Sequence, residues 1–129
     1  QLRQLFQNLI ANALKFHKKD TPPVVTITSC HANDAGLWTI TVEDNGVGFD
    51  QKNAERIFKP FERLHGRSEY EGSGIGLAVC QKIVQRHGGE ITAQSVPLAG
   101  TKFIITLPEE QAQEIMLPFE KENPGAGMV

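Results

Sequence analysis

Three glycines at alternate positions, Gly72, Gly74 and Gly76, stand directly before a stretch with helical periodicity. Glycine just before a helix lets backbone N–H groups approach an anion, and the helix dipole also favours negative charge there. The spacing therefore indicates phosphate binding. The plain alternative is a glycine-rich entry to a helix that binds no ligand.

Two familiar phosphate-binding loops do not match these glycines. The dinucleotide fingerprint needs a strand directly before its first glycine, whereas residues 62–71 are polar and not strand-like. A P-loop ends in Gly-Lys-Ser/Thr, but Gly76 is followed by Leu77 and Ala78. A phosphate site at these glycines would therefore belong to another class of phosphate-binding loop.

The N-terminal residues 1–17 carry apolar side chains at spacings of three and four, which predicts an amphipathic helix. At 100° per residue, Asn8, Asn12 and Lys15 lie together on one flank of the apolar stripe. Taken singly, each is explained as the border of a solvent-facing surface. Two amides and one ammonium on a single edge favour a ligand-facing role.

A carboxylate is predicted to point inward at the end of a strand. Residues 24–30 and 37–44 are rich in β-branched residues and are joined by a hairpin loop at 33–36. Period two places Asp44 on the same face as the apolar Ile40 and Val42. A buried carboxylate needs hydrogen-bond donors, from its own loop or from a ligand. Asp44-Asn45-Gly46-Val47-Gly48 is also compatible with an Asx-type turn that serves only to leave the strand.

The remaining elements complete one α/β domain of the α+β type. Prolines 22 and 23 end the first helix, and a short helix is expected at 51–57, followed by a mobile polar loop. A helix at 74–87 ends at a glycine pair, and strands at 91–95 and 101–107 flank a loop that ends in Gly100. We expect the domain to cover 1–108, with a flexible C-terminal tail at 109–129.

Composition excludes several classes of protein. The chain has 129 residues, 40% of them hydrophobic and 22% charged, and a net charge of -2, which is typical of a folded soluble domain. Its scattered basic residues argue against nucleic-acid binding, and the absence of an apolar run of ~20 residues argues against membrane contact. Cys30 and Cys80 are far apart and are expected to be buried thiols in a reducing, cytoplasmic compartment.

Five motifs in order resemble the ATP-binding catalytic domain of sensor histidine kinases, in the GHKL ATPase superfamily. Asn8–Phe16 resembles the N box, Asp44–Gly48 the G1 box and Phe58–Phe61 the F box. Gly72–Leu77 resembles the G2 box, and Gly100-Thr101 resembles the closing glycine-threonine motif. The resemblance covers residues 1 to about 107 and begins within the N-box helix, so an N-terminally truncated domain is expected. The segment 64–70 is similar to lids of kinases attached to PAS-type or phytochrome-like sensors.

This resemblance implies a Bergerat-type two-layer sandwich: a mixed, mostly antiparallel sheet with about three helices on one face. It implies ATP and Mg²⁺ as ligands, with Asp44 accepting a hydrogen bond from the adenine amino group and Asn12 ligating the metal. Asn8, Lys15 and Arg63 are implied as catalytic residues. The implied nucleotide-binding residues are Asn8, Asn12, Lys15, Phe16, Asp44, Gly46, Gly48, Phe49, Ile57, Arg63, Gly72, Gly74, Gly76, Leu77 and Thr101.

The position of Asn8 resembles that of a glutamate which activates water in hydrolytic relatives, and an amide cannot act as a general base. The resemblance therefore favours transfer of the ATP γ-phosphoryl group to a histidine on a separate dimerisation domain, with a response regulator downstream. None of the four histidines of this chain matches the family's acceptor, and the isolated domain is expected to be monomeric. A hydrolytic GHKL ATPase and a degenerate nucleotide-binding or docking module are the alternatives.

Overall fold

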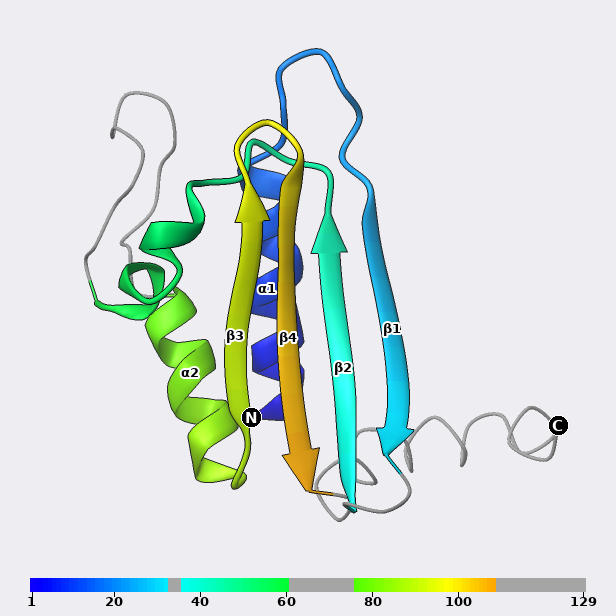
Figure 1. Cartoon of the computed structure of the whole chain (residues 1–129), viewed down its shortest axis with the longest axis vertical. Helices are drawn as coiled ribbons and strands as arrows, with labels where there is room; N and C mark the ends of the chain where they lie inside the picture. The colour runs from blue at the N-terminus through cyan, green and yellow to red at the C-terminus, as the bar shows by residue number, and fades with distance from the viewer. Residues whose placement is uncertain (33–35, 61–75, 109–129) are drawn as a thin grey trace, which may run out of the picture.

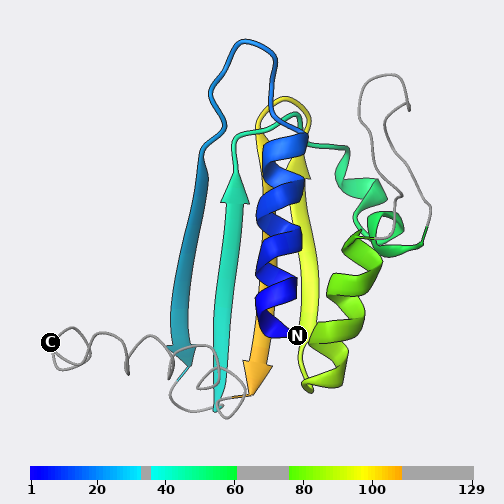
Figure 2. The same ribbon diagram turned by 180° about the vertical axis from the view of Figure 1, so that it is seen from behind.

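In the described part of the chain, four antiparallel strands form one sheet, and two α-helices lie on one of its faces (Figures 1 and 2). The computed structural model describes residues 1–32, 36–60 and 76–108. The elements follow in the order α1 (Leu2–Lys15), β1 (Val25–Ala32), β2 (Leu37–Asp44), the 3-10 helices η1 (Gln51–Asn53) and η2 (Arg56–Phe58), α2 (Gly76–Arg86), β3 (Glu90–Val96) and β4 (Gly100–Pro108). The strand order in space is β1-β2-β4-β3.

The sheet register sorts the inward-facing residues into rows across the strands. Ile27, Val42, Phe103 and Ala93 form one apolar row. At the next inward-facing position toward the end of β2, the row is Val25, Asp44, Thr101 and Ser95. Because side chains alternate with period two, both rows face the helices. The polar row is therefore placed at the end of the sheet where β2 stops and β4 begins.

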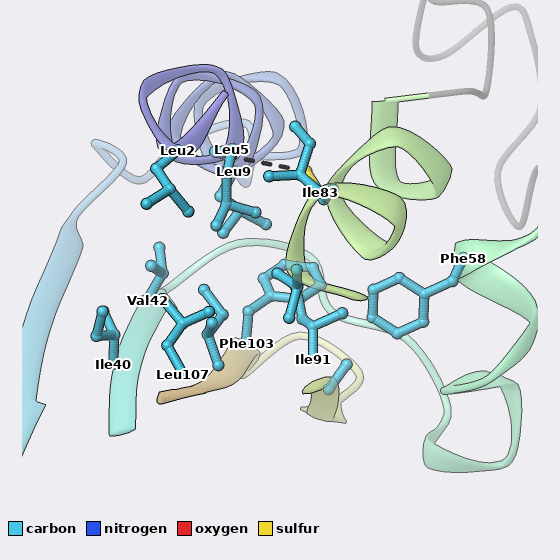
Figure 3. Close-up of a cluster of buried hydrophobic side chains, with 14 of the residues drawn as sticks. Leu2, Leu5, Leu9, Ile40, Val42, Phe58, Ile83, Ile91, Phe103 and Leu107 are labelled. Carbon is cyan, nitrogen blue, oxygen red and sulfur yellow. Dashed lines mark hydrogen bonds between the residues drawn. The ribbon is translucent and has the colours of Figure 1, made fainter. Parts of the chain in front are cut away.

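The helices bury their apolar stripes against the apolar rows (Figure 3). Leu5 and Leu9 of α1, Val84 of α2 and Phe103 of β4 are at most 1% exposed. Phe58 of η2 meets Phe103 edge to face, with ring centroids 6.2 Å apart. Strand β1 lies at the sheet edge away from α2, and its inward-facing Ile27 remains 49% exposed.

Most expected elements are present, with bounds shifted by a few residues. The two-layer α/β fold is confirmed. The short helix expected at 51–57 was predicted wrongly, because two 3-10 helices occupy 51–53 and 56–58. The side chain of Gln51 bonds to Ala93 O and Ser95 N, which fixes the first turn to the edge of β3. All three strand pairings among the described residues are antiparallel, so no parallel pair of a mixed sheet is found there.

Of the two thiols expected to be buried, only one is buried. Cys80 is fully buried between the helices, whereas Cys30 is exposed. Cys30 lies on β1, the edge strand, on the face turned away from the helices, so nothing in the described chain covers it. The tail at 109–129 lies outside the described residues.

Candidate functional site

The inward-pointing carboxylate of Asp44 lies at the end of β2 and is held by backbone donors. Its Oδ1 accepts a hydrogen bond from Gly46 N at 2.8 Å, and the Thr101 N–H also donates to the carboxylate. Burial raises the Asp44 pKa, and these two N–H groups act in the opposite direction. Two oxygens offer about four acceptor positions, so the two backbone donors leave acceptor capacity for a further donor.

The loop after Asp44 is pinned to elements on both sides. Val47 N donates to Phe16 O at 2.9 Å, which attaches the loop to the end of α1. Leu98 N donates to Val47 O at 2.7 Å, which attaches the loop to the β3–β4 hairpin. The Asn45 side chain bonds to Val24 N and Pro22 O, so it also fixes the segment that enters β1. Asp44 and Gly46 do form an Asx-type turn. The loop that contains it connects the end of α1, the segment that enters β1 and the β3–β4 hairpin.

Close packing explains why two glycines of this region carry no side chain. A Cβ on Gly46 would stand 2.5 Å from Phe16 O and 2.9 Å from Asp44 Oδ1. Gly48 has φ +63, and a Cβ there would stand 2.2 Å from Val96 O. The bare backbone therefore lets the loop approach the end of α1 and the hairpin.

The polar flank of α1 contacts α2 through Asn8, and at its end Lys15 lies near the ring of Phe16. Asn8 hydrogen bonds through its side chain to Cys80 of α2, whose thiol also lies 3.8 Å from Leu5 O. Burial raises the pKa of the Cys80 thiol to about 11. At the end of α1, the Lys15 Nζ stands 5.1 Å from the centre of the Phe16 ring. Asn12 is partly buried one turn before Phe16.

The apolar residues expected at the site pack against the main core. Ile57 is 8% exposed and belongs to the core, and Phe49 and Leu77 are partly buried against it. The structure thus brings the end of α1, the end of β2, the start of β4 and the loop 45–49 together at one end of the sheet (Figure 1).

This arrangement recurs in known proteins. Residues 1–111 match the family of histidine kinase-, DNA gyrase B- and HSP90-like ATPases. The chain belongs to that ATPase family. Phytochrome-like protein Cph1 of Synechocystis sp. is 47% identical over 108 residues, which cover 84% of this chain and 14% of that protein. Sensor histidine kinase WalK of Bacillus subtilis is 34% identical over 116 residues, which cover 88% of this chain and 19% of that protein.

Solved structures of sensor kinases share the fold of this ATPase domain. The mycobacterial sensor histidine kinase MprB gives a TM-score of 0.71 at 26% identity and covers 83% of this chain and 69% of that chain. Full-length ShkA in complex with AMPPNP gives a TM-score of 0.70 at 28% identity and covers 83% of this chain and 21% of that chain. This chain spans about one seventh of the length of the curated relatives Cph1 and cyanobacterial phytochrome A.

The motifs expected at the phosphate side of the site are only partly described by the structure. Arg63, Gly72 and Gly74 lie outside the described residues, as does the lid segment 64–70. Gly76 is the first residue of α2, and no described atom lies within 4 Å of a Cβ built there. Packing within the described chain therefore does not explain the glycine at 76.

Three polar residues that help build this end of the ATPase domain were not identified from the sequence. Asn45 and Gln51 connect loops to strands, and Ser95 is buried at 6% exposure beside Thr101. Period two does place Ser95 on the inward face with Ile91 and Ala93. Its partners come from segments 5 to 46 residues away, so only the folded chain could identify them.

Two further features of the described residues concern metals and membranes. No group of three or more histidine, cysteine, aspartate or glutamate side chains is placed to hold a metal ion within residues 1–32, 36–60 and 76–108. In the same ranges, every helix is too short or too polar to span a bilayer.

Proposed function

We propose that this chain is the ATP-binding catalytic domain of a sensor histidine kinase and that it transfers the γ-phosphoryl group of ATP to a histidine on a separate dimerisation domain. The observation that carries the proposal is the Asp44 carboxylate, which is partly buried, held by two backbone donors and still able to accept a hydrogen bond. The exocyclic amino group of adenine is a donor that fits this acceptor. The sensor kinases among the relatives and solved neighbours support the reaction class.

The adenine end of the proposed site is formed by the elements that meet at Asp44. Gly46 and Gly48 keep the loop close to the base, and Phe16, Phe49 and Ile57 supply apolar surface beside it. Thr101, the second residue of β4, contributes its hydroxyl. The neighbour ShkA, solved with AMPPNP, supports an adenine nucleotide as the ligand class.

The phosphate end is proposed on α1 and at the start of α2. Lys15 and Arg63 meet phosphate charge, and Gly72, Gly74 and Gly76 expose backbone N–H groups leading into the first turn of α2. Leu77 anchors the helix start against the core. These roles for Arg63, Gly72 and Gly74 rest on the sequence resemblance alone.

Asn12 is the proposed protein ligand of Mg²⁺. Within residues 1–32, 36–60 and 76–108, no group of three or more carboxylate, histidine or cysteine side chains is placed to hold a metal ion, so the donor set that these residues offer is sparse. Mg²⁺ fits such a set, since it commonly takes one or two protein oxygens and completes its shell with water and substrate phosphates. The Asn12 amide oxygen is a suitable hard donor, and Asn8 supports it from one turn earlier. When bound, Mg²⁺ neutralises phosphate charge.

Asn8 favours transfer to an outside nucleophile over hydrolysis. An amide cannot take a proton from water, whereas phosphoryl transfer depends mainly on positioning and charge stabilisation. In the proposed reaction an imidazole nitrogen forms a bond to the γ-phosphorus while the bond to the β–γ bridging oxygen breaks, and ADP leaves. The acceptor histidine lies on the dimerisation domain, and a response regulator is the downstream partner. The domain itself is proposed to be a cytoplasmic monomer without nucleic-acid or membrane contacts.

Mixing this chain with its matched dimerisation domain and γ-labelled ATP tests the proposal. Label on the histidine of the dimerisation domain is expected, and an Asp44→Asn chain should transfer less. Release of free phosphate alone would replace the kinase with a hydrolytic ATPase. If neither product forms and no nucleotide binds, the result would favour a docking module.

A further inference from the structure

Ser95 and Thr101 form a buried polar pair at the adenine end of the site. They face each other across β3 and β4, and Thr101 faces Asp44 across β4 and β2. Ser95 is 6% exposed and Thr101 is 8% exposed. The two hydroxyls approach to 3.0 Å, a contact in which either one has the geometry to donate.

The other partners of Ser95 decide the direction of that hydrogen bond. Ser95 Oγ lies 2.8 Å from the carbonyl oxygen of Gly100, which can only accept, so the single serine proton is used there. Phe49 N donates to Ser95 Oγ at 2.9 Å and occupies one of its lone pairs. The second lone pair remains for the Thr101 hydroxyl. Thr101 must therefore be the donor to Ser95.

This direction fixes what Thr101 can offer to a ligand. Its one hydroxyl proton is spent on Ser95, so only the lone pairs of Thr101 Oγ1 remain available. The neighbouring Asp44 carboxylate is also an acceptor. The row thus presents acceptors alone at the place where the base is proposed to bind.

The position of Ser95 is itself fixed by a third element. Gln51 of η1 accepts a hydrogen bond from Ser95 N at 2.9 Å and donates to Ala93 O at 3.1 Å. These two bonds fill the open edge of β3 in the way a neighbouring strand does. Ser95 is therefore held against the hairpin and the loop 45–49 at once.

We propose that Ser95 is a positioning residue that sets base specificity by holding the Thr101 hydroxyl as an acceptor. The proposal rests on the proposed function, in which Asp44 receives the adenine amino group. At position 6, adenine donates to this row through its amino group, whereas a 6-oxo purine places another acceptor there and carries its donor on N1 instead. An acceptor facing acceptors leaves buried groups unpaired, which costs affinity. Without Ser95, the Thr101 hydroxyl is free to turn and donate to a 6-oxo group.

The test is a calorimetric comparison of ADP with inosine diphosphate, which carries a 6-oxo base. We expect the wild-type chain to prefer ADP. The preference is measured as the dissociation constant of inosine diphosphate divided by that of ADP. Ser95→Ala should lower this ratio about tenfold, the scale of one hydrogen bond changed from unpaired to paired. Ser95→Thr, which keeps a hydroxyl on a strand position, should retain the ratio. Thr92→Ala on the outer face of β3 is the matched control and should also retain it.

A purely structural role for Ser95 gives a different result. Ser95→Ala would then weaken both nucleotides equally, and an unchanged ratio would overturn the proposal. If Ser95→Ala does not fold, Thr101→Val provides the second readout, because it removes the acceptor with little change of volume and should also lower the ratio. An unchanged ratio in Thr101→Val would overturn the proposal as well. A wild-type chain that does not distinguish the two nucleotides would instead refute adenine recognition by Asp44.

Discussion

Replacing Asp44 with asparagine tests the adenine site directly. Asp44 Oδ1 already accepts from Gly46 N at 2.8 Å, and Thr101 N–H donates to the carboxylate as well. In the asparagine variant one of the two acceptor oxygens becomes an NH₂ group, which is a donor, whereas the groups around it, the two backbone N–H groups and the adenine amino group, are donors as well.

The expected loss follows from the change in hydrogen-bond type. A bond to a charged group contributes roughly 1.5–3 kcal/mol and a neutral one roughly 0.5–1.5 kcal/mol, so the variant loses more than about 1 kcal/mol of binding free energy. This corresponds to affinity weaker by about fivefold or more. The donor–donor contact adds to this loss.

Calorimetric titration with a non-hydrolysable ATP analogue and Mg²⁺ measures the effect. Glu43→Gln is the matched control, because it makes the same carboxylate-to-amide change on the adjacent, exposed residue of β2. Thermal unfolding of both variants checks that each is folded. Equal affinity in Asp44→Asn and wild type would remove Asp44 from the site and refute the reasoning.

Three further predictions concern the domain itself. Burial raises the Asp44 pKa above 3.8, so the folded chain holds this proton more tightly than the unfolded chain. The free energy of unfolding of the wild type should therefore fall relative to Asp44→Asn as pH rises from about 3.5 to about 7, and urea midpoints that keep a constant difference would contradict this. A thiol reagent should modify Cys30 in the native chain and reach the buried Cys80, with its pKa of about 11, only after denaturation. Gly100→Ala should destabilise the domain by more than about 2 kcal/mol, because φ is +122 and the new Cβ would stand 2.0 Å from Asp44 O. Gly36→Ala, at φ +63 with open space, should cost only about 1 kcal/mol in chemical denaturation, and equal losses in the two variants would show that the close contact is unimportant.

The strands and long helices were predictable because each has a clear local period. Residues 37–44 form β2 with the bounds expected, and the alternation that put Asp44 inward is confirmed by its place in a row with Thr101 and Ser95. The helix before Gly88 ends where the sequence indicates, and Gly88 has φ +77. The region 51–58 was harder, because eight residues give little periodicity and the Gln51 side chain ties the first turn to β3.

The site residues on the sequence motifs remain predictions about ligand contacts, but the structure accounts for several of them as packing positions. Gly46 and Gly48 face carbonyl oxygens of the chain itself, and Asn8 contacts Cys80. A glycine in a motif does not say what its missing side chain makes room for. That requires knowledge of the atoms opposite, which come from distant segments.

The sequence by itself determined the α/β class, the inward direction of Asp44 and the order of motifs that identifies the family, since these depend on local periodicity and on residue types along the chain. Only the tertiary structure decided which donors hold Asp44, why Cys30 is exposed while Cys80 is buried, and which way the Ser95–Thr101 hydrogen bond runs. The physical reason is that burial and hydrogen-bond direction depend on partners brought close by folding. Ser95 gains its defining partners from residues 49 and 100, and no local pattern reveals that its single proton belongs to Gly100.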